Sequence, residues 1–589
     1  MAPIQVVNAS GIVSISAATY SLTFPPDRPF VYVHDAQGRR LAELFVLSSV
    51  HPLHDRDDTV AIGAWEIEAT PGGAICTLRA QSSVWREKIY RLRCETQRFS
   101  YDIEIAGSAR LAEVCYFGGY SSGQQRWGSG FFSSGQHFRQ GFNPEPNTEE
   151  RSYFATNGGS RIDLTGVPLP GKGDWFFTPP PFCFAFQGPD QWLALGVEAQ
   201  PGMHQFTEYW YHGSTGFHLS LAYEGHTTVD GAYRLPAIGF DVGADEFQAL
   251  AAHVRAARQT LGTPTVAARD QPAWWYEPIF CGWGSQCAAA ATERGHAPEY
   301  ARQPLYESFL STLAAQDIDP GIVVIDDKWQ ASYGENQVDA RKWPDLRGFI
   351  DGQHALGRKV LLWLKAWDAE GVPPAECITN AAGVPLAVDP SHPAYEQRLR
   401  ESVRRMLAAD GYDADGFKID FTARIPSGPG MRSYGGLWGL ELLKRYLTII
   451  YRAAKAVKPN ALIMTHTPHP YLADALDMIR LNDAFDLNRL DEGIVGRDLG
   501  KTMALRARVA ALACPDAIID TDNWPVRDLA TWREYLDVQP ELGVPSLYFA
   551  SHIDLTQELL EAADYQQIRE TWAVYREQRT KSNGTTNKE

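Results

Sequence analysis

The stretch DGFKIDFTARIP, residues 415–426, carries the strongest signal of fold and function in the chain. Its residues 416–419 predict a short buried strand that ends at a carboxylate, Asp420. Residues two positions apart on a strand share a face, so Lys418 and Asp420 point the same way. A neighbouring cation keeps a carboxylate ionised, as a nucleophile requires, although an ordinary ion pair at a strand end fits the pattern equally well.

The residues on both sides of this stretch, 271–578, alternate between apolar strands and amphipathic helices. Helical spacing is clear in segments such as LYESFLSTLAAQ (305–316) and AYEQRLRESVRRMLAAD (394–410). Eight strand–helix units over about 300 residues predict a catalytic (β/α)8 TIM barrel. The eight strands are expected at 278–283, 321–326, 359–364, 415–420, 461–466, 477–481, 517–520 and 545–551.

The N-terminal part of the chain, residues 1–243, has a different pattern. Short alternating segments such as FVYVHD (30–35) and KIYRLRC (88–94) are separated by polar turns such as TPGG (70–73). Many short strands with polar turns predict an antiparallel β-sandwich. The chain is therefore expected to be a multidomain protein, with a β-sandwich followed by an α/β barrel.

Three further segments complete the predicted domain organisation. Residues 244–270 are expected to form a helical linker, because apolar residues recur in ADEFQALAAHVRAARQTL (244–261) at helical spacing. Residues 579–589 are expected to form a polar C-terminal tail. Residues 120–180 are rich in glycine, serine and aromatic residues and predict a long loop, for which a functional role and a structural insertion are equally plausible.

Composition narrows the classes of function. The net charge of −17 and the pI of about 5.4 disfavour nucleic acid and anionic membranes as partners. The eight cysteines are scattered without a CxxC pair or a Cys/His cluster, which argues against a zinc site and against a disulfide framework. We expect neither a metal nor a cofactor. The N-terminus lacks the pattern of a secretory signal, which predicts a cytoplasmic protein. The 17 tryptophans and 25 tyrosines favour sugar binding, because aromatic faces pack against the C–H faces of sugar rings.

Polar side chains gather at the carboxyl ends of the expected strands, where TIM barrels carry their chemistry. A single aspartate there can simply cap a helix, but carboxylates at four strand ends with tryptophans among them are harder to explain as capping. Such a set without a metal or phosphate motif suits a glycoside, because a retaining glycosidase needs one carboxylate as nucleophile and a second as general acid/base. The expected site residues are Asp420, Asp483, Trp283, Asp326, Asp327, Trp363, Lys365, Lys418, His466, Arg480, Asp522 and His552. For Trp363, His466 and His552 a structural role fits equally well.

Several motifs in the barrel resemble those of the clan of retaining α-glycosidases that contains glycoside hydrolase families 27, 31 and 36. FKIDF (417–421) is similar to the nucleophile motif shared by families 31 and 36. VVIDDKWQ (323–330) resembles the family 36 strand whose two carboxylates bind sugar hydroxyls, and MIRLND (478–483) resembles its pattern of an arginine followed by the acid/base aspartate. The residues 502–524 resemble the stretch that leads into barrel strand 7. The barrel looks closest to family 36 α-galactosidases, with family 31 features in residues 343–364.

The resemblance implies a retaining α-glycoside hydrolase that acts by double displacement through a covalent glycosyl-enzyme intermediate. Asp420 would be the nucleophile and Asp483 the general acid/base, with Asp491 as the alternative if the loop follows family 31, whose usual Trp-x-Gly-Asp motif is absent. By the same resemblance, Lys418 would bind the sugar and Asp522 would lie at the margin of the site.

The substrate is less narrowly implied than the mechanism. The paired Asp326 and Asp327 favour α-galactosidase activity. The alternatives are a family 31-like α-glucosidase or α-xylosidase, an α-N-acetylgalactosaminidase, a transglycosylase on the same scaffold, and a non-catalytic sugar-binding protein. The expected partner is an oligosaccharide or a small α-glycoside, and members of the clan often form homo-oligomers.

Overall fold

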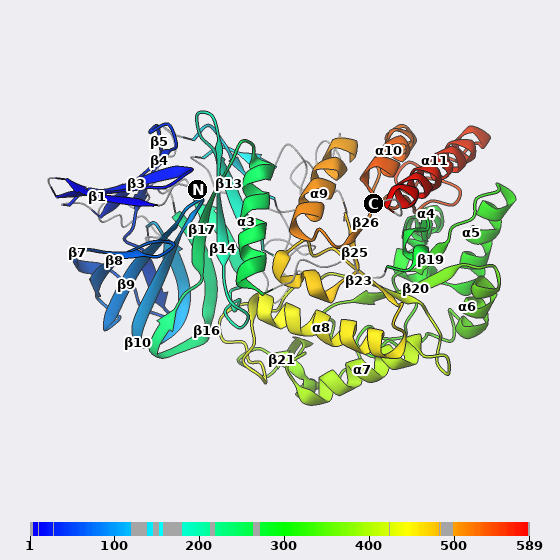
Figure 1. Cartoon of the computed structure of the whole chain (residues 1–589). Coiled ribbons are helices and arrows are strands. Elements are labelled where there is room, and N and C mark those ends of the chain that lie inside the picture. The colour runs from blue at the N-terminus through cyan, green and yellow to red at the C-terminus, as the bar shows by residue number, and fades with distance from the viewer. Residues whose placement is uncertain are drawn as a thin grey trace.

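The computed structural model describes residues 4–9, 11–26, 29–118, 138–144, 152–156, 180–212, 218–262, 271–422, 424–481, 483 and 499–586. Antiparallel sheets occupy the N-terminal part, and a parallel barrel wrapped by helices occupies the C-terminal part (Figure 1). This architecture confirms the predicted fold class. Most of the expected loop at 120–180 lies outside the described residues.

The first sheet is a five-stranded antiparallel meander. Burial alternates along two of its strands, and in β4 Val31 and Val33 point into the core while their neighbours are partly exposed. Aromatic pairs join this sheet to the next one, with ring centroids 5.0 Å apart for both Tyr20–Phe99 and Phe24–Trp65. Its strands, in spatial order, are β1 (Gln5–Ala9), β2 (Ile12–Ser16), β3 (Tyr20–Phe24), β4 (Phe30–Asp35) and β5 (Arg40–Phe45).

The second sheet is larger and also antiparallel. A register shift between Leu111 and Glu113 interrupts its longest strand, β10, which pairs with β9 and β17 at one end and with β6 and β16 beyond. The main path runs β12-β11-β13-β14-β17-β10-β9-β8-β7, and β15 pairs with β16. Its strands are β6 (Ser49–Pro52), β7 (Thr59–Thr70), β8 (Gly73–Ser82), β9 (Glu87–Glu95), β10 (Phe99–Tyr116), β11 (Gly141–Phe142), β12 (Tyr153–Phe154), β13 (Cys183–Gln187), β14 (Trp192–Glu198), β15 (Glu208–His212), β16 (His218–Arg234) and β17 (Ala237–Gly243).

Helix α3 (Glu246–Thr260) lies where the two parts of the molecule meet (Figure 1). Asp245 caps its N-terminus by accepting a hydrogen bond from the backbone N–H of Gln248, 2.7 Å away. The helix packs on strands β13, β14 and β17 of the large sheet and also against α9 (Leu499–Ala513) and η4 (Pro470–Ala475) of the barrel. The expected linker therefore contains a helix that contacts both parts, and its residues 263–270 lie outside the described chain.

The eight expected barrel strands are all present and all parallel. The strand order is β26-β25-β24-β23-β20-β19-β18-β27, and a parallel bridge between Asp520 and Val544 brings the two ends of this sheet together. The last strand is much shorter than the apolar run 545–551 predicts, because the chain leaves the sheet after Leu547. The strands are β18 (Ile279–Cys281), β19 (Ile322–Ile325), β20 (Lys359–Lys365), β23 (Gly416–Asp420), β24 (Leu462–Thr465), β25 (Met478–Arg480), β26 (Ile518–Asp520) and β27 (Ser546–Leu547).

Helices cover the outside of the barrel, as Figure 1 shows. None of the helices among the described residues has the length and apolarity needed to cross a bilayer. A small hairpin, β21 (Cys377–Thr379) with β22 (Pro385–Val388), was not expected, and α11 continues to Thr586 through most of the expected polar tail. The helices are η1 (Ala273–Tyr276), α4 (Trp283–Glu293), η2 (Ala297–Tyr300), α5 (Gln303–Ala315), α6 (Leu346–Ala355), η3 (Pro374–Glu376), α7 (Pro393–Leu407), α8 (Gly439–Val457), η4 (Pro470–Ala475), α9 (Leu499–Ala513), α10 (Leu529–Leu542) and α11 (Ala562–Thr586).

Candidate active site

A pocket of about 290 Å³ opens at the carboxyl ends of the barrel strands. Its floor is formed by side chains at or close to the carboxyl ends of β19, β20, β23 and β25, because parallel strands in a barrel all end at the same face. The pocket is large enough to hold one sugar ring. Its lining residues are Trp283, Asp326, Asp327, Trp363, Lys418, Asp420, Phe421, Arg424, Arg480, Asp483 and Trp524.

Asp420, the last residue of β23, is held by four hydrogen-bond donors. Its Oδ1 accepts from the backbone N–H of Phe421 (2.9 Å) and from Arg480 (3.2 Å), and it lies 3.2 Å from Nε2 of His466. Its Oδ2 accepts from the Trp363 indole N–H at 3.2 Å. Burial alone would raise the pKa of Asp420, but Arg480 and His466 outweigh burial and lower this pKa below its ordinary value. The carboxylate therefore stays ionised, as a nucleophile must.

Arg480, at the end of β25, joins the two candidate catalytic carboxylates. Its guanidinium donates to Asp483 at 2.7 Å and to Asp522 at 2.6 Å, in addition to its contact with Asp420. Burial raises the pKa of Asp483 to about 7; Arg480 opposes this rise, while Asp522 and Asp420 add to it. Two neighbouring carboxylates thus have pKa values shifted in opposite directions, which is the pattern required of a nucleophile and an acid.

The partner of Lys418 differs from the one that the strand pattern predicted. Lys418 donates to Asp326 at 2.7 Å, with both side chains only 3% exposed, and the cation in contact with Asp420 is Arg480. The thiol of Cys281 donates to the same oxygen of Asp326 at 3.1 Å. Lys418 still lowers the pKa of Asp420, but less than Arg480 and His466 do. It lies on the pocket floor on the same strand face as Asp420, as expected.

Asp327 lines the pocket beside Asp326 and accepts a hydrogen bond from the Tyr333 hydroxyl at 2.7 Å. Burial raises the pKa of Asp327 to about 7, against the lowering effect of this hydrogen bond. Lys365 lies next to the pocket rather than in its lining, where it pairs with Asp368 at 2.8 Å. The pair Asp326 and Asp327 therefore offers a sugar one carboxyl group that is paired with a lysine and one whose pKa is raised to about 7.

One of the expected site residues lies outside the pocket, and another lies outside the described part of the chain. His552 contacts Ser551 at 2.9 Å and Thr292 at 3.5 Å and is absent from the pocket lining. Asp491, the alternative acid/base, lies outside the described residues. Sequence reasoning also missed pocket residues, namely Phe421, Arg424 and Trp524. All three lie within segments already singled out, DGFKIDFTARIP and DTDNW (520–524), so proximity to the strand ends was the available signal.

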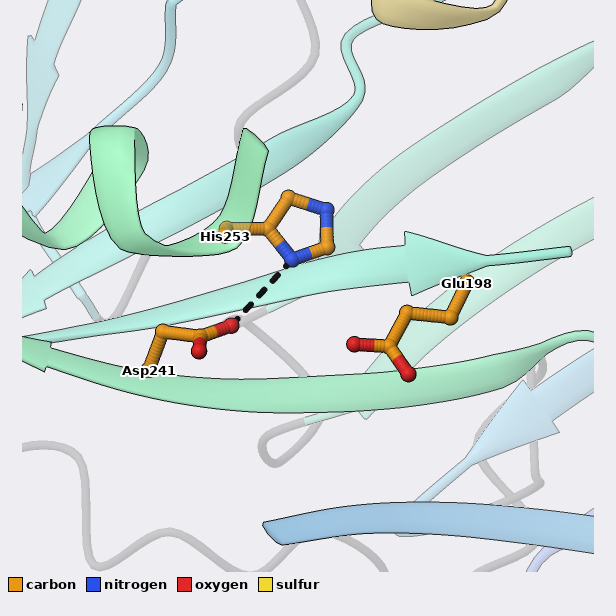
Figure 2. Close-up of side chains that lie close together, drawn as sticks. All are labelled: Glu198, Asp241 and His253. Atoms are coloured by element: carbon orange, nitrogen blue, oxygen red, sulfur yellow. Dashed lines mark hydrogen bonds and ion pairs between the residues drawn. The ribbon is translucent and has the colours of Figure 1, made fainter. Parts of the chain in front are cut away.

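A second buried group of potential ligands lies in the N-terminal part. Glu198, Asp241 and His253 come from β14, β17 and α3 and face one another, with 3.3 Å between His253 Nδ1 and Asp241 Oδ2 (Figure 2). Arg98 ion-pairs with both carboxylates, and its Nε lies 2.7 Å from Asp241. The guanidinium supplies the positive charge that a metal ion would bring, so the group is complete as a buried ion-pair cluster.

Comparisons with known proteins support the fold and leave the family open. No family model matches the chain, and no curated protein matches it. Among solved structures, the α-galactosidase TtGalA from Thermus thermophilus, in complex with stachyose, is similar at 14% identity with a TM-score of 0.52, covering 86% of this chain and 99% of that one. A family 31 sulfoquinovosidase from E. rectale, in complex with an aza-sugar inhibitor, is similar at 12% identity with a TM-score of 0.58, covering 97% of this chain and 82% of that one. At these identities the likeness shows the shared fold of a β region and a barrel.

Proposed function

We propose that the chain is a glycoside hydrolase that retains the anomeric configuration, with Asp420 as nucleophile and Asp483 as general acid/base. The observation that carries the proposal is that Asp420 and Asp483 are both buried and both contact Arg480, while the pKa values of the two carboxyl groups are shifted in opposite directions. Retaining enzymes need two carboxyl groups close together, and a single guanidinium that contacts both keeps them close. The similar solved structures, an α-galactosidase and a sulfoquinovosidase, add support from the fold.

The proposed reaction proceeds in two displacements. In the first, a carboxylate oxygen of Asp420 attacks the anomeric carbon, the bond to the leaving oxygen breaks, and Asp483 gives its proton to that oxygen. In the second, the ionised Asp483 removes a proton from water, whose oxygen displaces Asp420 from the anomeric carbon. Oδ2 is the better placed attacking atom because, among the described residues, Oδ1 receives three donors whereas Oδ2 receives the Trp363 indole alone.

An α-galactoside is the substrate that we favour. Asp326 and Asp327 lie side by side on the pocket floor, as a site for adjacent sugar hydroxyls requires. Trp283 and Trp524, in edge contact with ring centroids 5.7 Å apart, border the same pocket and can pack against C–H faces of a sugar. α-Glucosides, α-xylosides and α-N-acetylgalactosaminides have the same stereochemistry at the reacting carbon and belong in any test.

The test is the initial rate of hydrolysis of 4-nitrophenyl α-glycosides of galactose, glucose, xylose and N-acetylgalactosamine. Asp420→Asn is expected to lower kcat/KM by at least about a thousandfold, because it removes the nucleophile. Asp410→Asn is the matched control, since Asp410 is an exposed aspartate of the same domain that pairs with Arg404. Full turnover in Asp420→Asn would refute the assignment, and a new glycoside formed in preference to free sugar would identify a transglycosylase.

A further inference from the structure

A second buried arginine, Arg506, lies beside the candidate general acid. It comes from the middle of helix α9, and only 3% of its surface is exposed. Its Nη1 donates to the carbonyl oxygen of Leu481 at 3.0 Å and to that of Asp483 at 3.2 Å. A single nitrogen therefore joins two backbone carbonyls that lie two residues apart, in the segment that carries Asp483 beyond the end of β25.

The backbone after β25 is fixed at successive points. The N–H of Leu481 donates to the carbonyl oxygen of Asp520 at 3.0 Å, so the contact with β26 continues one residue past Arg480. Beyond Leu481, the carbonyl oxygen of Asp483 is bound by Arg506. Two arginines thus hold Asp483, since Arg480 donates to its side chain at 2.7 Å and Arg506 donates to its backbone.

The guanidinium of Arg506 keeps its charge in this buried position. Burial lowers the pKa of Arg506 to about 10, against the opposing effect of Asp483 and Asp522, which raise it. The side chain therefore remains protonated at neutral pH. Hydrogen bonds from a charged donor are stronger than those from a neutral one, so both carbonyl oxygens are held firmly.

Helix α9 gives Arg506 a well-packed support. The helix packs on α3, α10 and β26. On the same helix the exposed Arg508 places its guanidinium carbon 3.5 Å from the ring centroid of Phe247, a residue of α3. A side chain on a packed helix is located more precisely than one on a loop. Arg506 is therefore suited to fix a segment that has left the regular pairing of the barrel strands.

The position of a general acid decides whether it can work. Its carboxyl oxygen must come within about 2.6–3.2 Å of the leaving oxygen, and a displacement of about 1 Å can cost about a hundredfold in rate. Arg506 lies outside the pocket lining that the described residues form. Its effect on the reaction must therefore pass through Asp483 rather than through a contact with the sugar.

We propose that Arg506 is the positioning residue of the general acid, and that it holds the backbone of Asp483 so that the carboxyl group meets the leaving oxygen. The inference rests on the proposed glycosidase function, because Arg506 acts through Asp483. Its role differs from that of Arg480, which lines the pocket and contacts the carboxyl groups of both Asp420 and Asp483. Loss of Arg506 should impair the acid and leave the nucleophile in place.

The experiment measures kcat/KM of Arg506→Met on two α-glycosides of the same sugar, a phenyl glycoside, whose leaving oxygen must be protonated, and a 2,4-dinitrophenyl glycoside, whose leaving group needs no proton. Both rates come from one sample, so their ratio does not depend on the fraction of folded protein. We expect a loss of about 10–100-fold on the phenyl glycoside and of less than about threefold on the other. Arg508→Met, the same substitution on the same helix, should leave both rates unchanged. Equal losses on the two substrates in Arg506→Met would overturn the proposal.

Two further variants complete the test. Arg506→Lys keeps a charged donor without the planar guanidinium, so it should recover part of the rate on the phenyl glycoside. It also carries the test if Arg506→Met does not fold, because a loss confined to the phenyl glycoside supports the proposal and an equal or absent loss overturns it. Asp483→Asn separates this inference from the proposed function. A loss confined to the phenyl glycoside in Asp483→Asn, with equal losses in Arg506→Met, rejects the role of Arg506 alone, whereas equal losses in Asp483→Asn reject the general acid and the role of Arg506 with it.

Discussion

Two buried groups of charges, one in each part of the molecule, differ in how their carboxylates are balanced. In the N-terminal group, Arg98 pairs with both Glu198 and Asp241. His253 also contacts Asp241 (Figure 2). Although burial raises the pKa of Asp241, its hydrogen bonds with His253 and Arg98 outweigh burial and lower it. In the barrel, the single guanidinium of Arg480 forms ion pairs with three carboxylates, those of Asp420, Asp483 and Asp522.

The two clusters differ in the pKa values of their carboxyl groups. Burial raises the pKa of Asp483 and of Asp327 to about 7 in each case, because the available cations do not offset it. Buried carboxyl groups whose charge is not offset by nearby cations lower the free energy of unfolding, and they are typical of functional sites. Carboxylates that are each offset by a cation are typical of structural sites. Charge balance, rather than burial, therefore distinguishes the cluster around Arg98, which we expect to be stabilising, from the cluster around Arg480, which we propose to be reactive.

The largest effect on stability is expected when the balanced cluster loses its cation. Arg98→Met leaves Glu198 and Asp241 buried without a guanidinium, and we expect the free energy of unfolding to fall by about 3–5 kcal/mol. Urea denaturation followed by tryptophan fluorescence measures this loss. The exposed Arg404→Gln is the control, and kcat/KM per folded molecule should stay at the wild-type value. An unchanged urea midpoint would contradict a stabilising role for this cluster.

Replacing Asp483, the proposed general acid, should affect catalysis rather than stability. Asp483→Asn is expected to lower kcat/KM by about 10²–10⁴-fold on glycosides with poor leaving groups, because their oxygen must be protonated as the bond breaks. The loss should be much smaller for 2,4-dinitrophenyl glycosides, whose leaving group needs no proton. Equal losses on both kinds of substrate would show that Asp483 is not the acid.

The pH dependence of kcat/KM should reflect the opposite pKa shifts of Asp483 and Asp420. Asp483 must be protonated to act as an acid, so kcat/KM should fall about tenfold per pH unit above about 7. Asp420 must be ionised, and its lowered pKa places the acid limb below the ordinary range of aspartate. Rates between pH 4 and 9 on a glycoside with a poor leaving group, whose oxygen must be protonated, should give the alkaline limb and no acid limb. An alkaline limb that persists in Asp483→Asn would assign it to Asp327, whose pKa is also raised to about 7.

A smaller effect is expected at the hydrogen bond that supports Asp327. Tyr333→Phe removes the donor to this carboxyl group and should raise its pKa further, with a loss in kcat/KM of about 2–10-fold, since one such bond contributes about 0.5–1.5 kcal/mol. The measurement is kcat and KM on the best sugar of the panel. Tyr451→Phe is the control, because the hydroxyl of Tyr451 contacts Asp477 outside the pocket. An equal loss of kcat/KM in both variants would show that the effect is not specific to Asp327.

The sequence was sufficient to predict the barrel because its strands are apolar runs between amphipathic helices, a local pattern. GFKID (416–420) and IVVI (322–325) lie where that pattern placed them. The run 545–551 failed as a full strand because its apolar residues are buried against the barrel after the chain has left the sheet, and burial alone does not distinguish strand from coil. Similarly, the polarity of residues 579–589 predicted a tail, and polarity alone did not indicate the helix that extends to Thr586.

The site was predictable in outline, because side chains at the ends of parallel strands converge. Its pairings were not, since they depend on distances between strands. Lys418 pairs with Asp326, 92 residues away in sequence, rather than with its neighbour Asp420. Tyr333 lies in a turn and Arg424 lies outside the helices and strands, and no periodic pattern specifies the direction of such segments.

Trapping of the glycosyl-enzyme intermediate tests the proposed role of Asp420 most directly. The protein is incubated with the 5-fluoro-α-glycosyl fluoride of the best sugar, digested, and analysed by mass spectrometry. We expect one added fluorosugar per chain, on the peptide that contains Asp420, and none in Asp420→Asn. A label on another carboxylate, or steady hydrolysis of 4-nitrophenyl glycosides with no label at all, would contradict a covalent mechanism at this residue.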